Sequence, residues 1–188
     1  MSILDVDYLE GWRAALQDWA VPGDTREKAE TRGADDWAWL ANHFRAMNRA
    51  FRPEKDPFIA RLAPWLTKDA TALEIGAGAG RVTLPVAERV QRVIAVESSP
   101  GMRSVLAEEV AAHGLENVEV VAGTWPAVEV EPADVVYCSH VLYDVAEVGP
   151  FLHQMDVTAR RACFVYLTIT HPFAAFRDLW EAFRHWSP

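Results

Sequence analysis

The sequence has few cysteines and no long apolar run. Its 188 residues include two cysteines, Cys138 and Cys163, with no Cys-x-x-Cys pair, which excludes a paired-cysteine metal or redox centre and leads us to expect two buried thiols. No apolar run reaches the roughly 18 residues of a membrane helix, and the start lacks the charged and apolar segments of a secretory signal. We therefore expect a cytoplasmic protein with no membrane partner.

Basic residues are also few. Eighteen Lys and Arg stand against 27 Asp and Glu, which gives a formal net charge of -9 and a pI near 5.1. Such a chain repels a phosphate backbone unless its basic residues cluster. The longest Arg-rich patches here are pairs, so we expect no nucleic-acid partner. A hydrophobic content of 51% is enough for one full core.

The first part of the chain has helical patterns. Apolar residues at steps of three and four predict helices over 5–20 and 37–51, separated by a polar connector. Asp35 or Asp36 can cap the second helix, and Asp56 with Pro57 predicts the start of a third. We expect residues 1–55 to form a helical extension or lid and residues 56–188 to form the main domain.

From residue 70 short apolar runs alternate with helical patterns, which is typical of a parallel sheet with crossover helices. The predicted strands are 71–75, 92–96, 118–122, 134–138 and 162–169, and the predicted helices between and after them are 80–90, 100–113, 147–160 and 173–186. The fold class is therefore α/β, a doubly wound, mostly parallel, Rossmann-like sheet. Such sheets bind ligands beyond the carboxyl ends of their strands, where the strand order reverses.

A glycine-rich turn follows the first predicted strand, with the sequence Gly76-Ala77-Gly78-Ala79-Gly80. Alternate glycines let the backbone turn tightly and approach a ligand closely, and the next helix offers free N–H groups to a carboxylate. A nicotinamide dinucleotide site needs glycine at the sixth position of the motif, where this chain has Arg81. A nicotinamide-dependent oxidoreductase is therefore disfavoured, although it remains an alternative.

An acidic residue, Glu97, ends the second predicted strand about twenty positions beyond the turn. A carboxylate at this place can accept both hydrogen bonds of a ribose diol. Glu97 could instead cap the next helix, but Ser98 or Ser99 can do that. The position of Glu97 therefore favours a ligand that contains a ribose.

Together, Leu73 to Gly80 and Val96 to Met102 resemble the first two motifs of class I S-adenosylmethionine-dependent methyltransferases of the small-molecule type. The resemblance implies S-adenosylmethionine as cofactor and methyl transfer to an acceptor that the sequence does not identify. It also implies which residues bind the cofactor. Glu74 organises the turn near the amino-acid part of the cofactor, Glu97 holds the ribose hydroxyls and Met102 packs against the adenosine. The residues that face the amino-acid part are Gly76, Ala77, Gly78 and Gly80, and Ser98 is a further cofactor-binding residue.

The segment after the third predicted strand departs from the family pattern. An acidic residue that binds the adenine amino group is common there, whereas this chain has Gly123, Thr124 and Trp125. The Thr124 hydroxyl or backbone groups can supply polarity. Trp125 can stack on the adenine or serve as a structural tryptophan.

The fourth predicted strand ends in Ser139 and His140, which resemble the family segment beneath the methyl group. His140 is the best candidate for a general base, because an imidazole titrates near neutral pH. It can equally donate to a backbone carbonyl or contact the cofactor. Tyr143 and Asp144 have the same ambiguity.

The expected reaction is an in-line displacement that depends mainly on alignment and requires no metal. The antiparallel hairpin that usually ends the family's sheet is apparently missing. We expect either a piece of a longer protein or a sheet edge covered by the N-terminal helices or by a second copy, in a homodimer. Substrate contacts would then come from the first helices, at Tyr8, Trp12, Trp37, Trp39 or His43. A cofactor-binding module without catalysis is the main alternative function.

Overall fold

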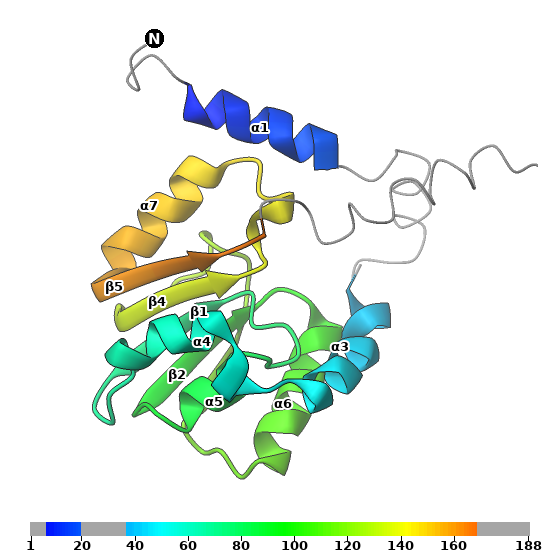
Figure 1. Cartoon of the computed structure of the whole chain (residues 1–188), viewed down its shortest axis with the longest axis vertical. Helices are drawn as coiled ribbons and strands as arrows, with labels where there is room; N and C mark the ends of the chain where they lie inside the picture. Colours follow the sequence, from blue (N-terminus) through cyan, green and yellow to red (C-terminus); the bar gives the residue numbers. More distant parts are fainter. Residues whose placement is uncertain (1–6, 20–36, 169–188) are drawn as a thin grey trace, which may run out of the picture.

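Five parallel strands form one sheet, in the order β3-β2-β1-β4-β5 (Figure 1). The computed structural model describes residues 7–19 and 37–168. The strands are β1 Thr71–Ile75, β2 Arg92–Glu97, β3 Val118–Ala122, β4 Ala133–Ser139 and β5 Ala159–Tyr166. The predicted doubly wound α/β sheet is confirmed.

Nine helical segments accompany the sheet in the described part of the chain. Its α-helices are α1 Tyr8–Trp19, α3 Ala38–Ala50, α4 Pro57–Leu62, α5 Thr83–Ala87, α6 Pro100–Ala112 and α7 Val148–Thr158, and its 3-10 helices are η2 Pro53–Lys55, η3 Ala63–Trp65 and η4 Leu142–Asp144. None of the helices within 7–19 and 37–168 is long and apolar enough to cross a membrane. The predicted helix 173–186 lies outside the described residues.

The strand order reverses between β1 and β4. The chain runs from β1 outward to β2 and β3, then returns to place β4 on the other side of β1. All strands are parallel, so their carboxyl ends meet at one edge. In open sheets of this kind ligands bind beyond the carboxyl ends of the strands at such a reversal, which here means the ends of β1 and β4.

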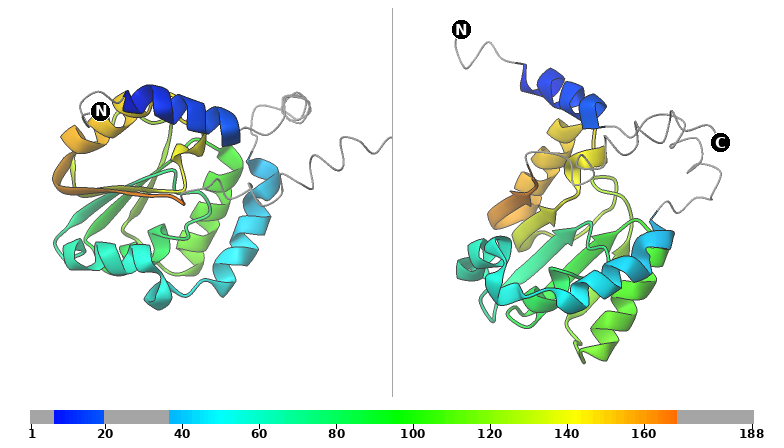
Figure 2. Two further views of the ribbon diagram at one scale, coloured as in Figure 1. Left: turned by 45° about the horizontal axis from the view of Figure 1, so that its top comes forward. Right: turned by 45° about the vertical axis from the view of Figure 1, so that its right-hand side comes forward.

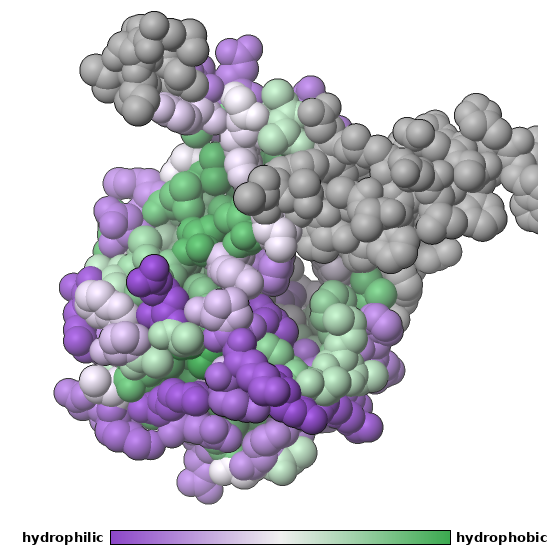
Figure 3. Space-filling model, in the orientation of Figure 1, coloured by the Kyte–Doolittle hydropathy of each residue, from purple (hydrophilic) through white to green (hydrophobic). Residues whose placement is uncertain are grey.

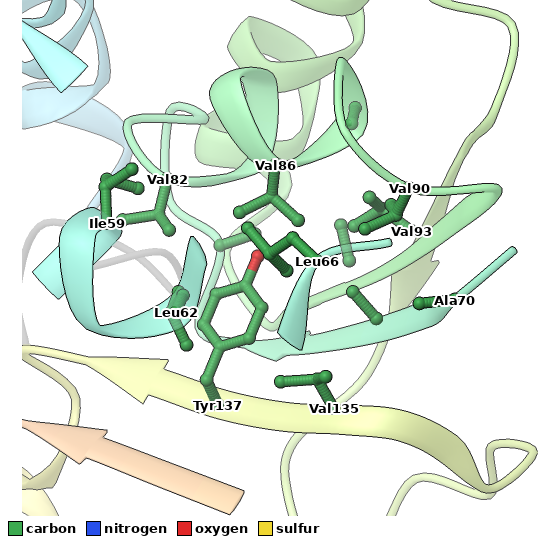
Figure 4. Packing of buried hydrophobic residues seen from close by; sticks show 14 of the residues in the cluster. Ile59, Leu62, Leu66, Ala70, Val82, Val86, Val90, Val93, Val135 and Tyr137 are labelled. Atoms are coloured by element: carbon green, nitrogen blue, oxygen red, sulfur yellow. The ribbon is translucent and has the colours of Figure 1, made fainter. Parts of the chain in front are cut away.

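The sheet has a separate apolar core on each face. On one face α4, α5 and α6 pack around Ala72, Val93 and Tyr137; on the other, α7 packs around Leu73 and Ile94. The left view of Figure 2 shows α1 and α7 on one side of the sheet and the remaining α-helices on the other. In Figure 4 the ring of Tyr137 extends from β4 into the first core. Neighbouring residues of one strand point to opposite faces, so both faces of the central strands are apolar.

Two predicted helix starts are confirmed. The Asp56 carboxylate accepts the backbone N–H groups of Phe58 and Ile59 at 2.9 and 3.0 Å, and it opens α4. The Ser99 hydroxyl accepts the N–H of Met102 at 3.1 Å and opens α6. Both side chains satisfy N–H groups that have no partner within the helix. The predicted caps Asp35 and Asp36 lie outside the described residues.

The two N-terminal helices pack on opposite layers. The Trp12 indole of α1 donates to the Val145 carbonyl at 2.7 Å, next to η4, and Arg13 pairs with Glu147 at 3.0 Å. Helix α3 instead lies along α6 (Figure 1). Helices α1 and α3 therefore belong to different layers of the domain.

Two predicted helices are shorter than expected. Helix α7 ends at Thr158, because the chain already pairs with β4 from Ala159 and not from residue 162. Helix α5 covers only Thr83–Ala87 of the predicted 80–90. Its expected first turn belongs to the glycine-rich connection, in which the Gly80 N–H bonds back to Ala77.

The prediction that both cysteines are buried is wrong for Cys163. Cys138 in β4 is buried, but Cys163 in β5 is exposed. In the described part of the chain β5 pairs only with β4, so its side chains have a neighbouring strand on one side alone. Hydrophobic surface gathers over this edge in Figure 3.

Candidate active site

The glycine-rich turn adopts a backbone conformation that L side chains rarely adopt. Gly76, Gly78 and Gly80 have φ angles of 70°, 55° and 88°. A Cβ at Gly76 would collide with Val141, and one at Gly80 would lie 2.9 Å from Leu106 Cδ1, whereas one at Gly78 would meet nothing within 4 Å. Gly78 therefore faces open space, and the other two glycines face packed side chains.

Hydrogen bonds tie the turn to the neighbouring strand β2. The N–H groups of Gly76 and Ala77 both donate to the Val96 carbonyl, at 2.8 and 3.1 Å. The Gly78 N–H donates to Oε2 of Glu97 at 2.7 Å. The predicted turn and the predicted ribose carboxylate are thus in direct contact.

The Glu97 carboxylate has hydrogen-bond acceptor positions that remain available to a ligand. It is 7% exposed at the end of β2, and its Oε1 accepts the Ser99 N–H at 2.8 Å. A carboxylate offers about four acceptor positions, and the protein bonds above fill two of them. Ser99 and not Ser98 caps α6, while the exposed Ser98 uses its carbonyl to accept from Arg103 at 2.7 Å.

Helix α3 closes the turn from outside the sheet. The Asn48 side-chain amide donates to the Ala79 carbonyl at 3.0 Å. Ala79 also shares a small apolar cluster with Ala41 of α3 and with Met102, which is 4% exposed. Met102, predicted to touch adenosine, therefore packs beneath α3. Asn48 was not predicted as a site residue, because no local pattern in the sequence links it to a turn about thirty residues away.

Glu74 lies behind the turn within the sheet. It is 2% exposed, and its Oε2 accepts from the Thr83 hydroxyl at 2.6 Å and the Tyr137 hydroxyl at 3.2 Å. Burial raises the pKa of this carboxyl to about 7, against the opposing effect of those two hydrogen bonds. These bonds connect Glu74 of β1 with α5 and β4, and its place near the amino-acid part of the cofactor stays a prediction.

The residues after β3 contribute unequally. Trp125 is 7% exposed, lies edge-on to Phe151 and donates its indole N–H to the Phe151 carbonyl at 3.1 Å. Of the two roles considered for Trp125, these contacts are those of a structural tryptophan. A Cβ at Gly123 would lie 2.6 Å from Val128, so this glycine is needed for packing, while Thr124 is exposed.

Arg81 joins three segments at the carboxyl edge of the sheet. Its guanidinium bonds to Asp56 Oδ2 at 3.0 Å and to the Ser139 hydroxyl at 2.6 Å, and it lies over the Phe51 ring, 5.1 Å from the centroid. Arg81 was not predicted as a site residue, because in the sequence it served only as evidence against a dinucleotide site. Its place directly after the third glycine was the signal that it points toward the site.

His140 lies immediately after β4 with a φ of 60°. Its backbone N–H donates to the Tyr166 carbonyl at 2.8 Å, and the Nδ1 atom of its ring lies 3.0 Å from the Tyr143 hydroxyl. Burial and the nearby Arg81 lower its pKa below the usual value, against the weaker opposing effect of Asp56. The lowered pKa favours the neutral imidazole, which is the form that can accept a proton.

The aromatic residues of the N-terminal helices differ in placement. Trp12 packs against the second core, whereas Tyr8 is 63% exposed and Trp37 is 40% exposed. His43 is exposed beside Phe44. The side chains of Trp39 and Asp144 are outside the described part of the structure.

The residues present fit a ligand with an amino-acid part and a ribose. Gly78 borders open space where a side chain would otherwise project, and the Glu97 carboxylate lies beside it. Across the strand-order reversal, Ser139 and His140 lie at the end of β4, and the Ser139 hydroxyl accepts from Arg81, which follows the turn after β1. The open space at Gly78 and the neighbouring Glu97 carboxylate are therefore the features of this edge that suit such a ligand.

Comparison with known proteins gives a matching family. The family described as a methyltransferase domain matches residues 72–179. A putative S-adenosyl-L-methionine-dependent methyltransferase from Methanococcus maripaludis has a similar structure, with a TM-score of 0.59 at 15% identity over 77% of this chain and 69% of that one. Because the sequence identity is only 15%, this structural similarity supports the fold alone.

Two further relatives are informative. A precorrin 8w decarboxylase from Methanobacterium thermoautotrophicum has a TM-score of 0.53 at 27% identity, over 65% of this chain and 68% of that one. A probable ribosomal RNA small subunit methyltransferase A from Methanosarcina mazei is 47% identical over 58 residues, 31% of this chain and 21% of that protein. The chain spans about a fifth of the length of the curated relatives it matches.

Proposed function

Because this chain belongs to the methyltransferase domain family, we propose that it transfers a methyl group from S-adenosylmethionine to a small-molecule acceptor. S-adenosylmethionine is the cofactor that the family and its structural neighbours indicate. The observation that carries the proposal is the direct bond between the glycine-rich turn and the carboxylate at the end of β2, from Gly78 N–H to Glu97.

In this proposal the residues of the turn bind and orient the cofactor. The bound cofactor supplies a methyl group on a positively charged sulfur. Gly78 gives the backbone room to lie against the amino-acid part of the ligand, and Glu97 accepts the ribose hydroxyls with the positions its own bonds leave open. Fixing the donor in this way supplies much of the rate enhancement, since the reaction needs alignment above all.

We place the acceptor at the end of β4, within reach of His140. Its neutral imidazole takes the proton of an acceptor that must lose one. Ser139 contributes through the Arg81 guanidinium, which its hydroxyl helps to hold. We do not retain Trp125 among the cofactor contacts, because its indole is already bonded within the core.

The proposed domain division assigns residues 1–55 to a helical extension and residues 56–188 to the cofactor-binding part. The bond from Asn48 to Ala79 supports a role for the extension in shaping the turn. Helix α1 lies beside the segment that follows β4, where it can border the acceptor.

Ribosomal RNA is the alternative acceptor, because the curated relatives are named as ribosomal RNA methyltransferases. The net charge of -9 disfavours an RNA acceptor, because it repels the phosphate backbone. The absence of a nucleic-acid partner stays a prediction. The other alternative is a module that binds the cofactor without catalysis. Such a protein would bind S-adenosylmethionine but would transfer no methyl group to any acceptor.

The test is calorimetric titration of one protein batch with S-adenosylmethionine, S-adenosylhomocysteine and NAD, followed by methyl-transfer assays on small molecules and on ribosomal RNA. We expect both sulfur compounds to bind, NAD not to bind, and turnover with small molecules. Binding of NAD alone would contradict the cofactor, and methylation of RNA alone would contradict the acceptor class.

A further inference from the structure

One side chain, Arg81, connects the end of β4 to the glycine-rich turn and to the start of α4. Its guanidinium donates through Nη2 to the Ser139 hydroxyl at 2.6 Å and through Nη1 to Asp56 Oδ2 at 3.0 Å. Ser139 is the last residue of β4, and Arg81 follows Gly80 directly. One planar group therefore holds three segments that lie apart along the chain.

Asp56 holds the guanidinium in place, because both of its carboxylate oxygens are bonded. Oδ1 accepts the backbone N–H groups of Phe58 and Ile59 and caps α4, while Oδ2 pairs with Arg81. The Asp56 side chain is 10% exposed and that of Arg81 is 29% exposed. The ring of Phe51 covers the guanidinium as well. Separating charges that are largely withdrawn from water is costly, so the guanidinium stays where this pair places it.

The alternation of β4 directs the Ser139 side chain toward Arg81. Residues two apart in a strand point to the same face of the sheet. Tyr137 extends from β4 into the core on the side of α4 (Figure 4), and Ser139 is two residues further along. On this face Phe58 of α4 lies edge-on to the Tyr137 ring and stacks on Tyr166 of β5. The bond between Ser139 and Arg81 therefore lies in the layer that α4 forms.

His140 follows Ser139 with a left-handed backbone. Among the described residues it is the only one other than glycine with a positive φ, which is 60°. Such a conformation persists where the surrounding structure holds it. The backbone N–H of His140 donates to the Tyr166 carbonyl at 2.8 Å, and the residue before it is bonded to Arg81. These two bonds fix the direction in which the imidazole leaves the sheet.

The ion pair of Arg81 and Asp56 also lies beside the imidazole. Burial lowers the pKa of His140, Arg81 lowers it further, and Asp56 acts in the opposite direction. The other titratable groups against the ring are Tyr143 of η4, which stacks on it, and Tyr166 of β5, which lies edge-on to it. Interactions between charges weaken with distance, so a guanidinium that acts on the imidazole lies close to it.

We propose that Arg81 is a positioning residue. It ties Ser139, at the end of β4, to the glycine-rich turn and so fixes the backbone from which His140 meets the acceptor. The inference rests on the proposed function, in which His140 is the base. The guanidinium contacts no reacting atom in this role and acts through the end of β4. Its forked shape is required, because it holds two partners at once and the single ammonium group of a lysine does not reproduce that geometry.

The test is amide hydrogen exchange of the full chain, followed by NMR at the backbone N–H of His140. Ser139→Ala removes the hydroxyl and leaves the buried ion pair in place, and Arg81→Lys keeps the charge without the fork. In both variants we expect this exchange to become about ten-fold faster or more, which corresponds to the loss of one hydrogen bond to a charged group. The N–H of Ala95, in the middle of β2, reports global opening. The measured quantity is therefore the rate at His140 relative to the rate at Ala95.

The titration of the His140 ring, also followed by NMR, is a second measurement. Arg81→Met removes the cation and should raise the pKa of His140, whereas Asp56→Asn removes the opposing carboxylate and should lower it. Asparagine also caps helices, so Asp56→Asn preserves the start of α4. The spectrum of His140→Gln identifies the signal. Arg92→Met removes an arginine paired with Glu131 at the opposite edge of the sheet, and this matched control should change neither measurement.

An unchanged relative exchange rate at His140 in either Ser139→Ala or Arg81→Lys would overturn the inference. The same pKa of His140 in Arg81→Met and in the wild type would overturn it as well. Calorimetry with S-adenosylmethionine on the same samples keeps the proposed function separate. Absence of binding to the wild type, with the expected exchange rates, would reject the function and leave the tether. Binding with unchanged exchange rates would reject the positioning role alone.

Discussion

Gly78 combines a left-handed backbone with open space in front of it. Gly114, at the end of α6, has the same two properties, with φ of 63° against 55° and nothing within 4 Å of an added Cβ. The two glycines therefore share their local geometry and differ in location. Substituting each of them separates the effect of backbone strain on stability from the effect of a lost cofactor contact on affinity.

We expect Gly78→Ala and Gly114→Ala to lose similar stability, about 1 kcal/mol each, because alanine is strained at positive φ. Only Gly78→Ala should lose cofactor affinity, since its methyl group would project into the ligand space. Calorimetric titration with S-adenosylmethionine and chemical unfolding of both variants measure the two effects. Equal affinities in both variants would remove Gly78 from the cofactor site.

Glu97 is expected to contribute through charged hydrogen bonds. Glu97→Gln keeps the shape of the side chain and removes the charge, so we expect a loss of about 1 to 3 kcal/mol in S-adenosylmethionine binding. Glu119→Gln, an exposed residue of β3, is the control. The ribose role would be wrong if Glu97→Gln bound the cofactor as tightly as the wild type.

Glu74 links stability to pH. Its pKa is raised from 4.5 to about 7, so between these values the folded protein holds a proton that the unfolded chain has lost. The free energy of unfolding therefore falls by about 3 kcal/mol through this group as pH rises from about 4.5 to 7, and it levels off above that pH. Glu74→Gln should remove this slope, which urea unfolding at several pH values measures against the wild type. Equal slopes in the two proteins would contradict the raised pKa.

At the level of elements, helix α3 supports the glycine-rich turn. Asn48 bonds to the Ala79 carbonyl at 3.0 Å, and Ala41 packs against Met102 and Ala79. The helix is also linked to α6 by the ion pair of Arg45 with Glu109 at 3.2 Å. A helix far upstream in the sequence is thus part of the wall behind the cofactor turn.

We expect Asn48→Ala to weaken S-adenosylmethionine binding several-fold, because it removes one hydrogen bond that fixes the turn. Asn42→Ala makes the same chemical change at an exposed position of α3 and should have no effect. Titration of both variants checks this. A loss in both, or in neither, would mean that α3 does not position the turn through Asn48.

For the whole molecule, the cofactor turn and its supports join β1, β2, α3 and α6 in one structure. A ligand that binds only the folded state stabilises it by about 2.7 kcal/mol at a concentration 100 times Kd. For a chain of this size we expect Tm to rise by about 5 to 10 °C with S-adenosylmethionine. Thermal unfolding of wild type and Gly78→Ala tests this, and a similar rise in both would argue that the ligand binds elsewhere.

The sequence by itself determined the alternating strands and helices, the turn at Gly76 to Gly80 and the carboxylate at the end of β2. These follow from local causes: apolar periodicity, glycine at positive φ and side chains that cap helices. The fold class and the family followed from the same patterns, whereas the order of the strands came from the structure. The boundary of β5 did not, because pairing with β4 set it.

Only the tertiary structure decided which distant residues complete the site. The bond from Asn48 to Ala79, the contacts of Arg81 with Asp56 and Ser139, and the bond from the His140 N–H to Tyr166 each join residues separated along the sequence. It likewise placed Trp125 in the core and exposed Cys163 at the sheet edge. Such contacts depend on how elements pack, and no periodicity within one segment encodes the side chain that a neighbouring element presents.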